Sequence, residues 1–91
     1  PLHTIVADVS RENDCRQLIE STVKAFGTID ILINNAGLSM RGLFADTTLD
    51  TYQRLMNVNF WGAVYCTKFA LPHLLAANGV VVGVSSIAGY R

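Results

Sequence analysis

The chain has 91 residues, no net charge and a pI near 7.2. A neutral chain offers no basic surface for a nucleic acid or an anionic membrane, so we expect neither as a partner. Hydrophobic residues make up 51% of the sequence and charged residues only 15%. A free-standing domain this small has a large surface for its volume and should be more polar, so the composition indicates an interior piece of a larger domain.

The ends of the sequence indicate whether the domain is complete, and the length of its apolar runs indicates whether it contains a membrane segment. The sequence starts at Pro1 rather than at a methionine and stops at Arg91, so we expect residues 1–91 to be one partial domain, incomplete at both ends. No apolar run approaches the roughly 20 residues that a transmembrane helix requires, and the sequence itself shows no signal-peptide pattern. We therefore predict no membrane segment.

The two cysteines, Cys15 and Cys66, lie in predicted helices and share no short-range spacing. We interpret them as buried free thiols rather than a disulfide, which fits a reducing, cytoplasmic compartment. His3 is interpreted as a strand residue and His73 as a residue on a helix surface, rather than as ligands. We assign no metal site.

In chain order, residues 2–7 are predicted to form a short strand that ends at Asp8. Ser10 is expected to cap a helix over residues 11–26, because a serine side chain can accept a hydrogen bond from the first backbone N–H groups. Apolar residues recur along that helix at helical spacing, which predicts one buried face. Gly27 stands where a helix-ending residue in the left-handed conformation is expected.

A second strand is predicted over residues 29–33, and Asn34-Asn35-Ala36-Gly37 follows it directly. Apolar residues occupy both alternating faces of this strand, which is the pattern of a strand covered by helices on both sides. The small residues Ala36 and Gly37 would let a flat ring or a phosphate-bearing group approach the backbone. An ordinary turn is the alternative interpretation, because asparagine and glycine both favour turns.

A second helix is predicted to begin at a cap formed by Thr47 or Thr48 and to run through Asn57-Val58-Asn59. The stretch from residue 60 to residue 77 is apolar nearly all round. It must therefore be covered by the sheet and by something else, for which a partner subunit is one candidate.

The third predicted strand covers residues 80–84, after a turn at Asn78-Gly79, and it leads into Ser85-Ser86-Ile87-Ala88-Gly89. The order strand, helix, strand, helix, strand has connections too long for hairpins, which predicts an α/β fold with parallel strands and right-handed crossovers. All three strands end in polar or small residues, and the carboxyl ends of parallel strands meet at one edge of the sheet. Ligands of open α/β sheets bind at that edge, so we predict a ligand site there.

Four sequence motifs resemble those of the short-chain dehydrogenase/reductase family in their order and separation. They are Asp8-Val9, Asn34-Asn35-Ala36-Gly37, Asn57-Val58-Asn59 and Val84-Ser85-Ser86-Ile87-Ala88-Gly89. The resemblance covers essentially the whole chain. It implies a three-layer, Rossmann-like, doubly wound parallel sheet, of which residues 1–91 would carry the family's strands 3, 4 and 5.

Five residues match the part of the family that binds the cofactor: Asp8, Val9, Asn34, Ala36 and Gly37. The carboxylate of Asp8 resembles the group that hydrogen-bonds the adenine ring, and the backbone after the second strand resembles the wall of the adenosine half of the site. Asn35 is expected instead to stabilise the sheet. The implied cofactor is NAD or NADP, a choice that the family makes through charges after its second strand, which lies outside this sequence.

Two residues match catalytic residues of the family, Asn59 and Ser86. Asn59 resembles the asparagine whose backbone carbonyl holds a water in the proton relay, and Ser86 resembles the serine that hydrogen-bonds the substrate oxygen. Reducing a carbonyl with a nicotinamide hydride builds negative charge on oxygen, so a hydroxyl donor must face it. The family's acid/base pair, Tyr-x-x-x-Lys, and its glycine-rich turn do not occur in residues 1–91.

The resemblance implies an oxidoreductase that transfers a hydride between NAD(P)(H) and an alcohol or carbonyl substrate. Residues 1–91 without the acid/base pair would be inactive, and without the preceding strands they are not expected to fold alone. The alternative is a non-catalytic fragment or homologue that acts through its apolar helix in subunit assembly. Family members commonly associate through this helix, so we expect a homo-oligomer formed through the helix around residues 59–76.

Overall fold

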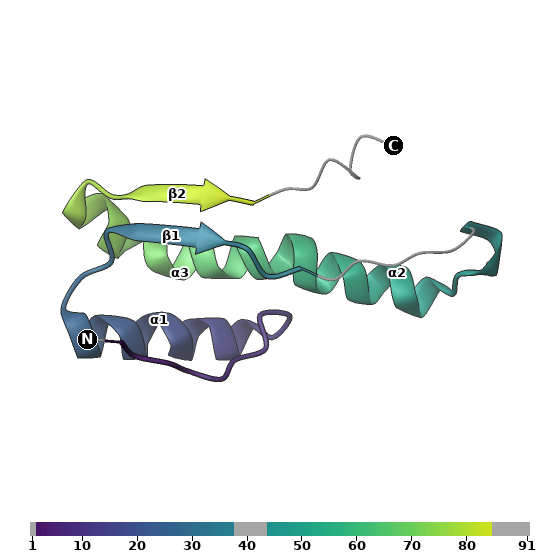
Figure 1. Ribbon diagram of the computed structural model, residues 1–91, viewed down its shortest axis with the longest axis horizontal. Coiled ribbons are helices and arrows are strands. Elements are labelled where there is room, and N and C mark those ends of the chain that lie inside the picture. The colour runs from purple at the N-terminus through teal and green to yellow at the C-terminus, as the bar shows by residue number, and fades with distance from the viewer. Residues whose placement is uncertain (1, 38–43, 85–91) are drawn as a thin grey trace.

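The structure is a computed structural model that describes residues 2–37 and 44–84. Its elements follow one another along the chain as helices, two strands and two short irregular helical segments (Figure 1). They are α1 (Glu12–Phe26), β1 (Ile31–Asn34), the 3-10 helix η1 (Phe44–Asp46), α2 (Leu49–Met56), the π-helical segment η2 (Asn57–Trp61), α3 (Gly62–Ala77) and β2 (Val80–Gly83).

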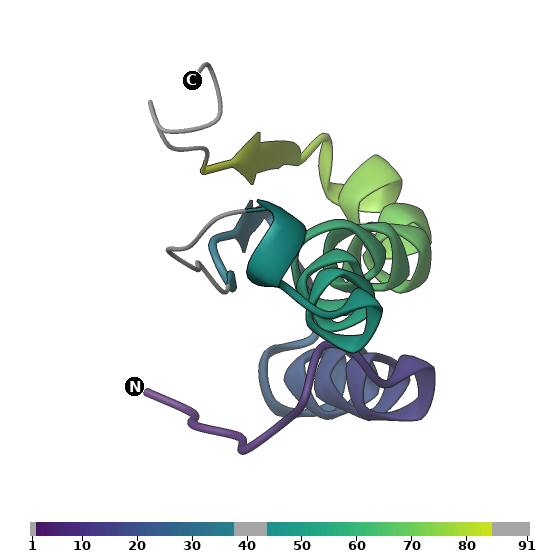
Figure 2. The same cartoon turned by 90° about the vertical axis from the view of Figure 1, so that its right-hand side faces the viewer.

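The strands β1 and β2 form a parallel sheet whose register pairs Ile31 with Val80 and Asn34 with Gly83. The chain passes from β1 to β2 through α2, η2 and α3, which is the helical crossover that a parallel pair requires. Helices α1 and α3 lie on the same side of this sheet (Figure 2). The predicted α/β class and the parallel pairing of the second and third predicted strands are confirmed.

A small apolar core lies where α1, α3 and the start of β1 meet. Its buried members are Ile19, Ile29, Ala70 and Leu74. The helices α1 and α3 run side by side and in the same direction (Figure 1). Their register is shown near one end by Val9, which packs on Gly62, and further along by Arg16, whose guanidinium carbon lies 5.2 Å from the centre of the Phe69 ring.

Residues 2–7 do not form the predicted strand. They run along α1, where a ring nitrogen of His3 lies 3.2 Å from the Ser21 hydroxyl, and Leu2 and Val6 are almost fully exposed. A strand is stabilised by hydrogen bonds to a neighbouring strand. Within the described part of the chain, β1 pairs only with β2. Residues 2–7 therefore have a sequence that favours a strand but no neighbouring strand to pair with.

The prediction that β1 is covered on both faces is also wrong for the described residues. Ile31 and Ile33 have 62% and 59% of their surface exposed, whereas Leu32 is half-buried against the core. The alternation arises because the helices cover only the face to which Leu32 points. The opposite face of the sheet is apolar and uncovered in this part of the structure.

The helix ends follow the expected chemistry at three of four positions. Gly27 ends α1 and Asn78 ends α3, both in the left-handed conformation with φ of 82° and 52°. The Thr48 hydroxyl accepts the backbone N–H of Thr51 and caps α2. Ser10 does not cap α1, because its hydroxyl donates to a nearby carboxylate and the preceding turn places Arg11 at the cap position instead.

Both cysteines are free and buried, as predicted. No helix among the residues that the structure describes is long and apolar enough to cross a bilayer. In the same residues, no group of three or more histidine, cysteine and acidic side chains comes together as a metal site would require.

Candidate functional site

A cavity of about 740 Å³ opens at the carboxyl edge of β1 and β2, the edge at which the sequence predicted a ligand site. Its walls come from the turn before α1, α1 itself, both strands and the residues that follow them, the π-helical segment and the start of α3. The lining residues are Val9, Leu18, Leu32, Ile33, Asn34, Asn35, Ala36, Gly37, Val58, Asn59, Gly62, Ala63, Cys66, Gly83 and Val84. Small-molecule sites are cavities of roughly this size, about 300–1,000 Å³.

The structure brings together most of the residues that the sequence predicted for the site. Val9, Asn34, Ala36, Gly37 and Asn59 all line the cavity. Asp8 does not, although it directly precedes Val9. The predicted catalytic serine, Ser86, lies outside the described residues.

The segment of residues 34–37, which runs from the last residue of β1 into the loop that follows, contacts the helix layer at its first and last residues. At its start, the side-chain amide of Asn34 donates to the Thr67 hydroxyl over 3.1 Å. At its end, a Cβ atom placed on Gly37 would lie 3.3 Å from the side-chain oxygen of Asn59. The backbone at Gly37 therefore passes Asn59 closely, and glycine leaves the space that a side chain would fill.

The expectation that Asn35 stabilises the sheet stays a prediction, and the structure adds a contact of the neighbouring Asn34 that the sequence did not predict. The side chain of Asn34, like that of Leu32, points toward the helices, because residues two apart in a strand share a face. Asn35 follows it and is exposed. Asn34 therefore joins β1 to α3 through its side chain, while its backbone oxygen accepts the N–H of Val84 over 3.0 Å.

Asn59 lies in the middle of η2, where the helix changes from α to π geometry. The π geometry of η2 is defined by hydrogen bonds between residues five apart. One of them runs from the backbone N–H of Gly62 to the backbone oxygen of Asn57. Such π-helical insertions are rare and are frequent at functional sites, because they displace backbone groups and side chains from regular helical positions. The sequence indicated a helix here but gave no signal for this change.

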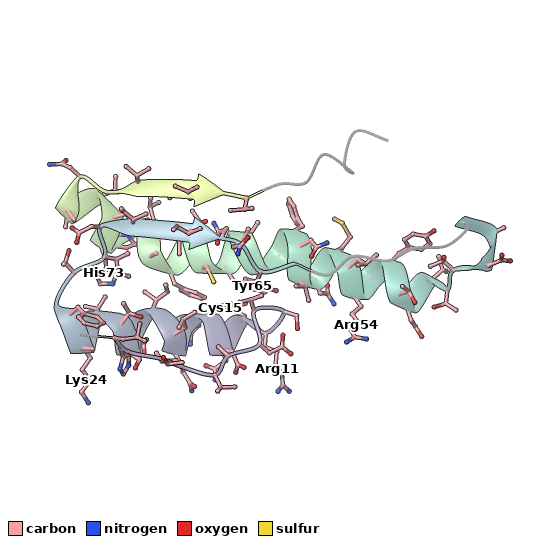
Figure 3. All side chains as sticks on the ribbon, viewed as in Figure 1. Arg11, Cys15, Lys24, Arg54, Tyr65 and His73 are labelled. Carbon is pink, nitrogen blue, oxygen red and sulfur yellow. The ribbon has the colours of Figure 1, made fainter. Side chains whose placement is uncertain are left out.

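The turn formed by Asp8, Val9 and Ser10 carries a carboxylate, that of Asp8, directly before the cavity-lining Val9. Both the hydroxyl and the backbone N–H of Ser10 donate to one Asp8 oxygen, over 2.6 and 3.0 Å. These hydrogen bonds hold the pKa of the Asp8 carboxyl below its ordinary value, and the positive charges of Arg11 and Arg54 add to the shift. Figure 3 shows both arginine side chains extending on the same side of the molecule.

Val9 connects this turn to α3. A Cβ atom on Gly62 would lie only 2.8 Å from a methyl carbon of Val9, so the two elements are in close contact. The Val9 oxygen also accepts the thiol of Cys15 over 3.4 Å. The position of the turn is thus fixed by packing rather than by strand pairing.

Sequence reasoning missed three residues of the site, Thr67, Gly62 and Cys66. Cys66 was predicted only as a buried thiol, without a role in the site. One signal was available, because Asn59 and Thr67 are eight residues apart and so fall on one face of a helix.

The family model for short chain dehydrogenase matches residues 1–91. The chain belongs to the short-chain dehydrogenase/reductase family. Among curated relatives, it is 44% identical over 88 residues to an 11-beta-hydroxysteroid dehydrogenase of Pinus massoniana, with 94% of this chain and 24% of the relative covered. It is 40% identical over 88 residues to 11-beta-hydroxysteroid dehydrogenase 1A of Arabidopsis thaliana, covering 96% of this chain and 25% of the relative.

Solved structures of the family agree with the fold. The NADH-dependent reductase A1-R' superposes with a TM-score of 0.89 at 34% identity, covering 96% of this chain and 38% of the reductase. ElxO with NADP bound superposes with a TM-score of 0.83 at 37% identity, covering 92% of this chain and 35% of ElxO. The chain spans about a quarter of the length of the curated short-chain dehydrogenases that it matches.

Proposed function

We propose that the full-length protein is an oxidoreductase that transfers a hydride between NAD(P)(H) and an alcohol or carbonyl substrate. The observation that carries this proposal is the cavity at the carboxyl edge of the sheet, where five of the predicted site residues meet. Membership of the family supports the reaction class. Similar structures that hold NADP or NAD support a nicotinamide cofactor.

The residues around the cavity fit a dinucleotide. Gly37 has no side chain, so its backbone is accessible from the cavity, and an adenosine group can pack against it. We propose that Asn34, Ala36 and Gly37 form one wall of the adenosine site through their backbone, with Val9 on its other side. The Asp8 carboxylate, kept ionised by its lowered pKa, would accept a hydrogen bond from the adenine amino group.

The cofactor supplies or accepts the hydride when it is bound. We propose that the Ser86 hydroxyl donates a hydrogen bond to the substrate oxygen, on which negative charge develops during reduction. Asn59 would hold a water of the proton relay through its backbone. The general acid and base would be the Tyr-x-x-x-Lys pair of the family, which residues 1–91 do not contain.

The test is turnover by the full-length protein with NAD⁺ and NADP⁺ in the presence of a hydroxysteroid, the substrate class that the names of the curated relatives suggest. We expect Ser86→Ala to lower kcat by about 100-fold or more, because a donor to the developing oxyanion is lost. Its matched control is Ser85→Ala, which should leave kcat near the wild-type value. A protein that binds neither nucleotide and turns over no alcohol would contradict the proposal and favour the assembly role.

We also propose that the protein is a homo-oligomer that associates through α3. An apolar groove of about 450 Å³ lies on this helix and includes Phe60, Val64 and Leu71, and Leu75 is 69% exposed further along it. We expect Leu75→Asp to reduce the molecular mass measured by light scattering to that of a monomer. Leu49→Asp, which changes an exposed leucine of α2, should leave the mass unchanged.

A cytoplasmic location is the last part of the proposal. It is supported by the two buried thiols, which are free rather than joined in a disulfide. Fractionation of cells that express the full-length protein with a tag tests it. Recovery with an organelle or in the secreted fraction would contradict it.

A further inference from the structure

Three residues form a stripe along the helix that faces the loop after β1. Asn59, Ala63 and Thr67 are spaced by four residues, so they lie one above the other on one helical face. The first two line the cavity. Thr67 lies beyond the cavity, and the Asn34 amide reaches it there.

The loop from Asn34 to Gly37 lies along this stripe in the opposite direction. Its first residue is bonded to Thr67, and its last residue lies against Asn59. The lengths agree, because eight residues of helix rise about 12 Å and three extended steps of chain cover about 10 Å. Residues 34–37 therefore span the distance between two contacts on one continuous helical run, in which α3 follows η2 directly.

The two contacts differ in kind. The contact at Gly37 is steric, since it depends on the absence of a side chain. The contact at Asn34 is a directional hydrogen bond, half-buried, between residues 33 positions apart in the sequence. A hydrogen bond in such surroundings sets orientation as well as distance, and a partner left without it is costly.

We propose that Thr67 is a positioning residue for the cofactor-binding loop: its hydroxyl holds the Asn34 amide and so sets where the backbone of Ala36 and Gly37 meets the nucleotide. This inference rests on the proposed function, because it assigns the loop to cofactor binding. Thr67 itself touches neither cofactor nor substrate. It acts through Asn34.

The test is Thr67→Val in the full-length protein, because valine keeps the shape of threonine and removes only the hydroxyl. NADH and NADPH are titrated separately, with nucleotide fluorescence as the signal. We expect the Kd of the nucleotide that the wild type prefers to rise by about tenfold, as the unpaired Asn34 amide lets the loop move. The kcat at saturating nucleotide should stay within about twofold, because the loop contacts the nucleotide and not the reacting oxygen.

Two further variants separate positioning from a general effect on stability. Thr67→Ser keeps the hydroxyl and should restore the wild-type Kd. Thr22→Val is the matched control, since the Thr22 hydroxyl donates over 2.8 Å to the Leu18 carbonyl within α1 rather than to the loop. Thr22→Val should leave the Kd unchanged even where it lowers the melting temperature. If Thr67→Val does not fold, Thr67→Ala takes its place.

The outcomes distinguish failure of the role proposed for Thr67 from failure of the proposed function. A wild type that binds a nucleotide, with Thr67→Val binding it equally well, overturns the role of Thr67 and leaves the proposed function standing. An equal rise in Kd for Thr67→Val and Thr22→Val also overturns that role, since the effect would then follow stability. A wild type that binds neither nucleotide overturns the proposed function, and the role of Thr67 with it.

Discussion

At the scale of single residues, Gly62 is the most crowded of the three described glycines that line the cavity, and the residue that crowds it is Val9. An alanine methyl group at position 62 would lie 2.8 Å from a methyl carbon of Val9 and 3.1 Å from its backbone oxygen. Valine is stiff at its first torsion angle, so the turn would have to move. We expect Gly62→Ala to lower the free energy of unfolding by about 1–2 kcal/mol, since overpacking outweighs the better helix propensity of alanine.

The measurement for Gly62 is denaturant unfolding of the full-length protein. Gly83→Ala is its control, because an added methyl group at Gly83 would meet no atom of the described residues within 4 Å. That variant should unfold within about 0.5 kcal/mol of the wild type. Equal losses in the two variants would show that the contact with Val9 does not constrain α3.

Cys15 illustrates how burial controls the chemistry of a residue. Burial raises the pKa of its thiol from 9.0 to about 12, and the neighbouring thiol of Cys66 adds to the shift. The reactive species is the thiolate, whose fraction falls tenfold for each unit by which the pKa exceeds the pH. At pH 8 we therefore expect Cys15 in the folded protein to react with iodoacetamide about a thousandfold more slowly than in the unfolded chain.

The pH dependence has a definite sign. A raised pKa means that the folded state holds the thiol proton more tightly than the unfolded state. The resulting stabilisation is present below pH 9.0 and is lost as the pH rises from there toward about 12. The alkylation rate of Cys15, followed by mass spectrometry of its peptide, should accordingly keep rising with pH well above 9. A plateau near pH 9 would indicate an exposed thiol.

The sequence was sufficient to predict that Asn34 and Gly37 would lie at the ligand edge, because strand ends of a parallel sheet gather there. Asn59 lies in a helical segment, and only the resemblance to the family assigned it to the site. The sequence was not sufficient to predict which amide binds Thr67. That depends on which residue ends β1, since a shift by one position turns every side chain to the other face. The sequence also could not predict the π-helical geometry around Asn59, because no residue type is specific to it.

At the scale of elements, α2 shows how much one end of a helix depends on its cap. It is eight residues long, has no buried residue, and begins where the Thr48 hydroxyl accepts the N–H of Thr51 over 3.3 Å. Short helices are marginal without tertiary packing, so the cap matters more here than in α1 or α3. We expect Thr48→Ala to destabilise α2 by about 1 kcal/mol.

Hydrogen exchange of the amides in α2 measures this effect locally. Exchange should quicken in Thr48→Ala across the first turn of the helix, while Thr48→Ser, which keeps the capping oxygen, should stay close to the wild type. Unchanged exchange in the alanine variant would mean that packing beyond the described residues, and not the cap, holds α2 in place.

The two helix starts explain one success and one failure of prediction. Threonine and serine are both good caps, and both precede acidic residues in the first turn. Ser10 fails because the cap position falls on Arg11, one residue later, while the Ser10 hydroxyl is oriented toward Asp8, to which it donates over 2.6 Å. Local propensity identified the helices and their ends to within a residue or two, whereas the position of the preceding turn decided which residue stands at the cap.

At the scale of the whole molecule, the chain is elongated. Its radius of gyration is 15.0 Å, with extents of 47 × 24 × 23 Å, against about 12 Å for a compact chain of this length. The shape follows from α2, which extends beyond the end of the sheet (Figure 1). Residues 2–7 and the outer face of the sheet both expose apolar side chains that no other described residue covers.

This surface leads to a prediction for residues 1–91 expressed by themselves. Ile31, Ile33 and Val80 each expose more than half of their surface, and a sheet of two strands is marginal in water without cover on both faces. Residual helix in α1 and α3 can persist, because they pack on each other through Ile19 and Ala70. In the described part of the chain, no residue covers the outer face of the sheet, where Ile31 and Ile33 are exposed.

We therefore expect the isolated 91 residues to keep helical circular dichroism but to unfold gradually on heating, bind a hydrophobic dye and associate as concentration rises. The full-length protein is the control, and it should show one cooperative transition and little dye binding. A sharp transition in a monomer of residues 1–91 would contradict this prediction. It would mean that the core between α1, α3 and β1 is sufficient to specify this part of the fold without the remainder of the sheet.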